Sequence, residues 1–173
     1  MIIRAVEVRE IAALSALASR TYAEAFGGSL PAKDLAAQLE ATRSAEYFRR
    51  VLQTDTILVA SLDDAIVGYV QLSEVRIPID DVTAADQELA ALYVAGEHQA
   101  KGIGKALVEA ALAQERFKRA PRIYLDVWEE NARAIALYTR YGFRSAGRRD
   151  FVVDGRVLGS DLVMERTVAE NLP

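Results

Sequence analysis

Residues 88–109 read ELAALYVAGEHQAKGIGKALVE, and this stretch decides the fold of the chain. Its first part, 88–94, is apolar and ends in Tyr-Val, which is typical of a strand. From residue 105 onward, the apolar residues recur at helical spacing. Between them, 99–104 contains two glycines, which allow a tight turn whose N–H groups can point into one space. The stretch predicts a strand, a turn and a helix, and a turn that opens a helix suits a phosphate.

Three nucleotide-binding patterns compete for the turn at 99–104. A P-loop requires a glycine where this chain has Gln99 and a Mg²⁺-binding hydroxyl where it has Ala106. A dinucleotide fingerprint requires a third glycine where this chain has Leu107. What remains is a pyrophosphate held by backbone amides without a metal, with the preceding strand available to an extended ligand. The alternative is an ordinary strand-to-helix turn.

Length and composition narrow the class of protein. A chain of 173 residues is long enough for one α/β domain with a substantial core, so we expect a single domain over 1–173. The net charge of −4 gives no basic field for nucleic acid and mildly favours cationic ligands. The chain has no cysteine, which excludes a disulfide scaffold, a thiolate metal site and an acyl-cysteine intermediate.

No signal peptide precedes the first strand-like pattern, so we expect a cytoplasmic location. We also expect no membrane partner and no metal. Spacings of three and four predict a helix over 7–26, and two more helices follow at 29–42 and 46–52. The next two strands, 56–62 and 66–75, are joined by a hairpin turn. Four aromatic residues of the helical region either line a pocket or pack in the core: Tyr22, Phe26, Tyr47 and Phe48.

Gly68, inside the second of these strands, predicts a bulge or a close backbone approach. The segment 76–87 is predicted to be a polar loop that leads to the central strand, either a solvated connection or an acidic rim beside a cationic substrate. After the central strand we expect one helix to about Lys118 and a strand over 122–128, which implies a parallel strand pair. The final segments predict a hairpin that turns at 154–155.

Asn131 and Tyr138 belong to the helix that follows this strand and ends at Gly142. They are seven residues apart, which is two helical turns, so an amide and a phenol can face the same groove. The alternative is that Asn131 only caps the helix and that Tyr138 only packs in the core.

Taken together, four motifs resemble the GNAT family of acetyl-CoA-dependent N-acetyltransferases: Leu92-Tyr93-Val94, Gln99-x-x-Gly102-x-Gly104, Asn131-x-x-Ala134-x-x-x-Tyr138 and Gly142-Phe143. The resemblance covers nearly the whole chain in element order. It implies an α/β (α+β) fold: a single mixed, strongly twisted sheet of about six to seven strands, flanked by helices, with a splayed central parallel pair. The segments 125–131 and 159–164 are also similar to spermidine/spermine acetyltransferases of the PaiA type. Those enzymes tend to have Gln-Thr-Asp where this chain has Gly159-Ser160-Asp161.

The resemblance implies acetyl-CoA as cosubstrate and gives each motif a role. The backbone of the central strand at Leu92 and Val94 pairs with the pantetheine arm, and the glycine turn holds the pyrophosphate. Asn131 bonds the arm, and Tyr138 reaches the thioester sulfur. The residues expected to bind the cofactor are Leu92, Tyr93, Val94, Gln99, Ala100, Lys101, Gly102, Ile103, Gly104, Lys105, Asn131, Ala134 and Tyr138.

The expected chemistry is direct attack of an amine on the acetyl carbonyl in a ternary complex. An alkylammonium has a pKa near 10 and must lose a proton first. Glu88 is the candidate for binding or deprotonating the amine, and Tyr138 is the candidate for protonating the departing thiolate. The alternatives are that Glu88 is a solvated acid at a strand end and that a water chain takes the proton. His98 lies in the phosphate loop and is expected to have no catalytic role.

Three functions remain open for the chain. The helical insertion at 29–52 and the acidic balance favour a small amine or a polyamine as acceptor. A protein or peptide N-terminal amine would need an open groove across the sheet. A non-catalytic acetyl-CoA sensor would have Tyr138 in its core. Edge strands near the C-terminal hairpin make a homodimer an expected assembly.

Overall fold

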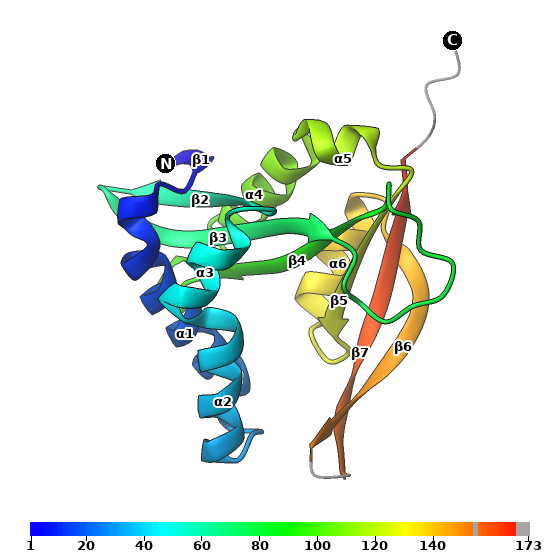
Figure 1. Cartoon of the computed structure of the whole chain (residues 1–173), viewed down its shortest axis with the longest axis horizontal. Coiled ribbons are helices and arrows are strands. Elements are labelled where there is room, and N and C mark those ends of the chain that lie inside the picture. The colour runs from blue at the N-terminus through cyan, green and yellow to red at the C-terminus, as the bar shows by residue number, and fades with distance from the viewer. Residues whose placement is uncertain (154–155, 169–173) are drawn as a thin grey trace. The chain divides into compact units, whose positions relative to one another are not determined.

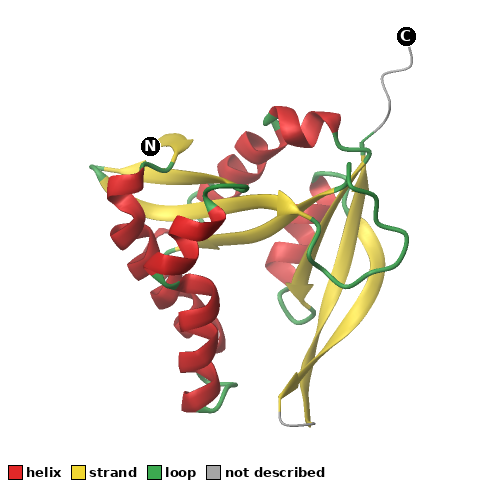
Figure 2. Cartoon of the chain, viewed as in Figure 1, coloured by secondary structure: helices red, strands yellow, loops and turns green. Residues whose placement is uncertain are grey.

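A computed structural model describes residues 1–153 and 156–168 of the chain. Its helices and strands are drawn in Figures 1 and 2. The strands are β1 Ile2–Ala5, β2 Thr56–Leu62, β3 Ala65–Glu74, β4 Gln87–Val94, β5 Arg122–Trp128, β6 Arg144–Val153 and β7 Arg156–Thr167. The helices are η1 Val8–Glu10, α1 Ile11–Phe26, α2 Ala32–Arg43, α3 Ala45–Val51, η2 Gly96–His98, α4 Ile103–Leu112, α5 Glu115–Arg119 and α6 Ala132–Arg140.

The strands form a seven-stranded sheet in the order β1-β2-β3-β4-β5-β7-β6. Pairing is antiparallel between β1 and β2, β2 and β3, β5 and β7, and β6 and β7. The pairing of β4 with β5 is parallel. The predicted fold class, a mixed sheet of six to seven strands with a central parallel pair and flanking helices, is therefore confirmed.

The chain divides into two compact units. Unit 1 consists of Met1–Leu72 and Ala91–Ala111, and unit 2 consists of Ser73–Ala90 and Leu112–Pro173. Strand β4 contributes its first half to unit 2 and its second half to unit 1. The prediction of one domain over 1–173 stays a prediction.

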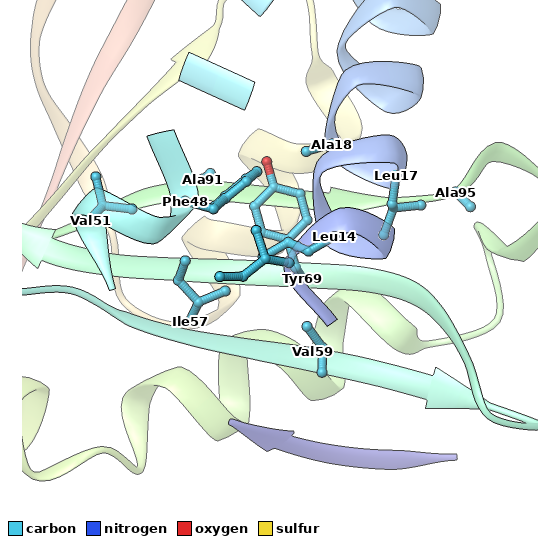
Figure 3. Close-up of a cluster of buried hydrophobic side chains, with 11 residues drawn as sticks. Leu14, Leu17, Ala18, Phe48, Val51, Ile57, Val59, Tyr69, Ala91 and Ala95 are labelled. Atoms are coloured by element: carbon cyan, nitrogen blue, oxygen red, sulfur yellow. The ribbon is translucent and has the colours of Figure 1, made fainter. Parts of the chain in front are cut away.

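The core of unit 1 lies between helices α1 and α3 and strands β2 and β3 (Figure 3). Tyr69 of β3 is fully buried, and Phe48 of α3 meets its ring edge-on at 6.0 Å between ring centroids. Each buried side chain of this size contributes about 1.5–3 kcal/mol of transfer free energy. The apolar stripe expected on 7–26 supplies the α1 side of this core: Ile11, Leu14, Leu17 and Ala18.

The hairpin between β2 and β3 has the predicted turn, because Asp63 (φ 47°) and Asp64 (φ 63°) both adopt the left-handed conformation of a two-residue hairpin loop. The predicted bulge or close approach at Gly68 is also present. The register shifts between Ala60 and Ser61, opposite Gly68. A Cβ on Gly68 would lie 3.0 Å from the carbonyl oxygen of Tyr93, so a side chain here would require β3 and β4 to separate by a few tenths of an ångström.

In unit 2, strands β5, β7 and β6 lie side by side (Figure 2). The predicted loop after β3 covers one face of β5, where Ile77 packs on Tyr124 and Val163. Asp86, at the end of this loop, is fully buried, and its carboxylate accepts hydrogen bonds from Arg122 Nη2 (2.7 Å) and Nε (3.2 Å). Asp86 therefore fixes the loop rather than forming part of an acidic rim.

The prediction of one helix from residue 105 to 118 is wrong. Helix α4 ends at Leu112, and α5 begins at Glu115 after an extended Gln114. Positions that would continue the apolar stripe of α4 carry Gln114 and Lys118, whereas the buried residue is Phe117, which is 1% exposed. A new helix places Phe117 in the interior. The predicted hairpin turn at 154–155 lies outside the described residues.

Candidate active site

The glycine turn of unit 1 leads directly into α4. Ala100 (φ 61°) and Gly102 (φ 81°) adopt left-handed backbone conformations, which fold the chain back before Ile103. The first intrahelical bond runs from the Ala106 N–H to the Gly102 carbonyl at 3.0 Å. In the described part of the chain, no acceptor bonds the N–H groups of Ile103, Gly104 or Lys105. These are the open donors of a helix N-terminus, and they suit an anion.

Gln99 connects this turn to the end of β4. Its side-chain Nε2 donates to the carbonyl oxygen of Val94 at 3.1 Å. The side chain therefore holds the turn against the strand. A substitution at Gln99 would act on the position of the turn as well as on any direct contact.

Alternate residues in the second half of β4 direct their backbone groups to opposite sides of the strand. The Ala95 N–H donates to the Val67 carbonyl at 2.9 Å, so odd-numbered residues here bond toward β3. The backbone groups of Leu92 and Val94 consequently point away from β3. The residues of β4 that pair with the parallel strand β5 are Gln87 and Glu88. The Leu92 backbone groups and the Val94 N–H thus form a strand edge that an extended ligand can pair with, while the Val94 carbonyl already accepts the Gln99 side chain.

Glu88 of unit 2 is 6% exposed. Its Oε2 accepts hydrogen bonds from the backbone N–H groups of Arg76 (2.5 Å) and Ile77 (3.0 Å). Burial raises the pKa of this carboxyl, and the charge of Asp126 raises it further. Glu88 Oε1 accepts no hydrogen bond from any described residue. One oxygen fixes the loop, and the other can take a proton.

Asn131 and Tyr138 lie on α6 of unit 2, two turns apart. Asn131 is the N-cap, since its Oδ1 accepts the Ala134 N–H at 3.1 Å, which leaves the side-chain amide N–H groups as donors. Tyr138 is 6% exposed and meets Phe143 edge-on at 5.8 Å between ring centroids. Gly142 (φ 85°) turns the chain so that Phe143 reaches this ring. Both alternatives raised for Asn131 are compatible with this geometry.

A sequence model of the acetyltransferase (GNAT) family matches residues 18–143. The chain belongs to the acetyltransferase (GNAT) family. It is therefore an acyltransferase, as the resemblance of its motifs predicts.

The GNAT chain is 34% identical over 156 residues to an uncharacterized N-acetyltransferase of Mycobacterium tuberculosis, an alignment that covers 88% of this chain and 94% of that one. It is 37% identical over 60 residues to a spermine/spermidine N(1)-acetyltransferase of Bacillus subtilis, which covers 34% of this chain and 40% of that one. Its fold is similar to the crystal structure of PaiA N-acetyltransferase from Thermoplasma acidophilum in complex with coenzyme A. The TM-score is 0.74, the identity is 22%, and 96% and 98% of the two chains are covered.

A charged cluster on unit 2 of the acetyltransferase was missed by the sequence reasoning. Arg149 of β6 contacts Asp126 of β5 at 2.7 Å and Asp161 of β7 at 3.4 Å. Burial, followed by the charge of Asp126, raises the pKa of Asp161. The registers place these residues on the same face of the sheet as Glu88. The alternation of side chains along β5 could have placed Asp126 on the face of Glu88, because Asp126 is two residues from Tyr124, the partner of Glu88.

The structure divides the predicted site residues of the acetyltransferase between its units. The strand edge and the turn belong to unit 1, and Glu88, Asn131, Ala134 and Tyr138 belong to unit 2. His98 precedes the turn, and its Nδ1 is enclosed without a hydrogen-bond partner among the described residues. The described residues contain no group of three His, Cys, Asp or Glu side chains that could hold a metal ion. Among the described helices, none is both long enough and apolar enough to span a membrane.

A substitution at Ala100 tests the left-handed backbone conformation of the turn in this acetyltransferase. Ala100→Gly is expected to raise the free energy of unfolding by about 0.5–1 kcal/mol, because relief of left-handed strain outweighs the extra freedom of glycine in the unfolded chain. Urea unfolding measures the change. Ala106→Gly, within α4, is the matched control and should lose about 1 kcal/mol. A loss of the same size at Ala100 would contradict the left-handed conformation.

Proposed function

We propose that this acetyltransferase moves an acetyl group from acetyl-CoA to a small primary amine. The observation that carries the proposal is the run of unit 1 from the strand edge at Leu92 and Val94 to the N–H groups that begin α4, which no described residue bonds. An extended arm suits the edge, and a pyrophosphate suits the helix N-terminus. Each charge-assisted hydrogen bond of this kind contributes about 1 kcal/mol or more.

The residues that the sequence motifs identify are proposed to bind the cofactor, each in a different way. When bound, acetyl-CoA supplies an activated acetyl group. Gln99 holds the turn in place, while Lys101 and Lys105, both exposed, add positive charge beside it. In unit 2, the side-chain amide of Asn131 is a donor for the pantetheine arm.

Glu88 and Tyr138 are proposed to move the protons of the reaction. Glu88 Oε1 takes the proton that the ammonium must lose before the nitrogen can form its bond to carbon. The Tyr138 hydroxyl donates a proton to the sulfur as the carbon–sulfur bond breaks. The raised pKa of Glu88 brings this carboxyl closer to the working pH of a general base.

Three observations support a small amine as acceptor. The net charge is −4, and Glu88, Asp126 and Asp161 share one face of unit 2 with Arg149, which pairs with the two aspartates. The local similarity to the spermine/spermidine enzyme of Bacillus subtilis extends this support to polyamines. A cytoplasmic location is proposed with this function.

A panel of acceptors tests the proposal by release of the CoA thiol from acetyl-CoA. The panel contains diamines, polyamines, amino acids, aminoglycosides and peptides. Release with small amines is the expected result. Release with peptides alone would favour N-terminal acetylation of proteins. Binding of acetyl-CoA without release to any amine would favour a non-catalytic sensor.

Tyr138→Phe is expected to lower kcat by about 10²-fold, because the variant keeps the ring that packs on Phe143 but loses the proton donor. The KM for acetyl-CoA should stay within about twofold, since the ring contacts remain. Steady-state thiol release measures both constants. Tyr141→Phe removes a hydroxyl three residues away and serves as the control. A Tyr138→Phe enzyme with undiminished turnover at every pH would exclude the acid role.

A further inference from the structure

Arg43 of unit 1 is enclosed by aromatic rings at the junction of α2 and α3. Its guanidinium carbon lies 4.8 Å from the ring centroid of Tyr22 and 5.3 Å from that of Tyr93. Nη2 lies 3.5 Å from the Tyr93 hydroxyl. The ring of Tyr69, in turn, stacks on Tyr93 at 5.8 Å. Contacts of this type each contribute about 0.5–2 kcal/mol, and the rings hold the guanidinium in one place.

The residue is also fixed through its backbone. The Arg43 carbonyl oxygen accepts a hydrogen bond from the Ser15 hydroxyl of α1 at 2.7 Å. The next residue, Ser44, caps α3 by accepting the Tyr47 N–H at 3.2 Å. The position of the guanidinium is thus set by three helices and by a strand.

Most of the hydrogen-bonding capacity of Arg43 is unused. Nη1 donates to the Thr42 carbonyl at 2.8 Å, and Nε is enclosed without any partner among the described residues. No Asp or Glu of residues 1–153 and 156–168 lies within 4.0 Å of the guanidinium nitrogens. An arginine stays charged in proteins, and a largely desolvated cation without a counterion costs several kcal/mol. An uncharged side chain would cover the same rings at lower cost.

The cluster lies beside the half of β4 that carries the proposed strand edge. Tyr93 belongs to the half of β4 that carries the proposed edge for the pantetheine arm, and its ring packs against the core formed with α1 and α3. Val94 points to the other face of the strand, since its Cγ2 and the Leu107 Cδ1 of α4 both lie 3.2 Å from a Cβ built on Gly68. Arg43 therefore lies on the face of β4 opposite α4, away from the proposed pyrophosphate turn.

We infer that Arg43, Tyr22 and Tyr93 form a subsite that binds a carboxylate group of the acceptor. The inference rests on the proposed function, and it narrows the acceptor from small primary amines to amines that also carry a carboxylate, such as amino acids. A carboxylate matches the planar fork of a guanidinium with two parallel hydrogen bonds. It would supply the missing counterion and the missing acceptors. A polyamine offers only further positive charge at this position.

Two pairs of acceptors that differ only in a carboxylate test the inference: ornithine against putrescine, and lysine against cadaverine. The wild-type enzyme should show a kcat/KM about 10- to 100-fold higher for the amino acid of each pair, the size expected for a charged hydrogen-bonded contact. Arg43→Gln should bring each ratio close to one. Arg43→Lys keeps the charge but loses the fork, so it should lower each ratio several-fold.

Arg50→Gln is the matched control. Arg50 also stacks on a tyrosine, Tyr47, with its guanidinium carbon 5.7 Å from the ring centroid, but it is exposed on α3. Its substitution should leave both ratios unchanged. Equal kcat/KM within each pair, or a loss of the same size for both members in Arg43→Gln, would overturn the inference and assign Arg43 a purely structural role.

Calorimetric titration with ornithine and with putrescine separates failure of the subsite from failure of the proposed function. The subsite predicts that ornithine binds more tightly than putrescine and that Arg43→Gln removes the difference. If this holds while no amine releases thiol, the proposed transfer is wrong and the subsite stands. If thiol is released while ornithine and putrescine bind alike, the transfer stands and the subsite is wrong. If Arg43→Gln does not fold, the Arg43→Lys protein provides the same comparison.

Discussion

Glu88→Gln is expected to lower kcat/KM for the amine by about 10²- to 10³-fold. The substitution keeps an oxygen that can accept the N–H groups of Arg76 and Ile77, so the loop after β3 should keep its position. What the variant loses is the carboxylate that takes the proton. Thiol release at saturating acetyl-CoA, with the amine varied, measures the effect.

The pH dependence gives this prediction a second readout. Burial raises the pKa of Glu88, so the ionised form, which acts as base, appears at a higher pH than for an ordinary glutamate. The wild-type kcat/KM should rise with pH through this pKa, and Glu88→Gln should lose that limb. The contribution of Glu88 to the free energy of unfolding changes with pH in the opposite direction to the activity. Because the folded-state pKa is above the unfolded one, the stabilisation from protonated Glu88 is complete below the unfolded pKa and is lost as pH rises through the folded pKa.

Glu88→Ala separates the two roles of the side chain. It removes the base and also the acceptor for two backbone N–H groups, so it should lower both the activity and the melting temperature. Glu88→Gln should lower the activity but leave the melting temperature unchanged. Wild-type activity in Glu88→Gln, with the acid limb intact, would assign the proton to a water chain.

Arg122→Met is expected to lower the free energy of unfolding by about 2–4 kcal/mol. It leaves the Asp86 carboxylate, whose side chain is fully buried, without the two nitrogens that now bond it at 2.7 and 3.2 Å. Arg122 also donates to the carbonyl of Asp81 and lies over the ring of Tyr124, 5.5 Å from its centroid. Methionine keeps the apolar contact with the ring. Urea unfolding, extrapolated to water, measures the loss.

The charge of Asp86 makes this loss depend on pH. Burial alone would raise the pKa of Asp86, but the bonds from Arg122 and Thr83 outweigh burial and lower it. A carboxyl with a depressed pKa stabilises the fold above its unfolded pKa, and this contribution disappears as pH falls through the folded pKa. The difference between wild type and Arg122→Met should therefore shrink in acid.

Arg119→Met is the control for a surface pair. Arg119 contacts Glu115 at 3.6 Å, with both side chains mostly exposed, and its loss should change the unfolding free energy by less than about 0.5 kcal/mol. An effect below about 1 kcal/mol at Arg122 would show that the loop after β3 does not depend on the buried pair.

Local sequence patterns predicted most of the fold because their physical causes are local. The hairpin at Asp63 and Asp64 follows from two residues that tolerate left-handed conformations, and the close approach at Gly68 follows from a missing Cβ. The break between α4 and α5 is not predicted by the sequence pattern, because the expected helix extends beyond Ala111, the last buried residue of α4. Burial of Phe117, rather than helix propensity, decides where the second helix begins.

In the candidate site, too, features within one element could be predicted from the sequence, whereas contacts between distant residues could not. The turn that opens α4 and the cap at Asn131 could be predicted, because backbone conformation and spacing within one element determine them. The contacts of Arg43 could not be predicted, because they join residues about fifty positions apart, such as Arg43 and Tyr93. The second role of Glu88, as acceptor for a loop that precedes it, likewise depends on tertiary structure.

Calorimetric titration of acetyl-CoA into the protein tests whether the cofactor binds at all, because every proposed step depends on a cofactor held by the turn at the start of α4. We expect saturable binding at one site per chain. In Gly102→Ala, binding should be at least about 10-fold weaker, since alanine strains a backbone at φ 81° that aims the N–H groups. Absence of binding to the wild-type protein would exclude both the proposed cofactor site and the proposed acetyl transfer.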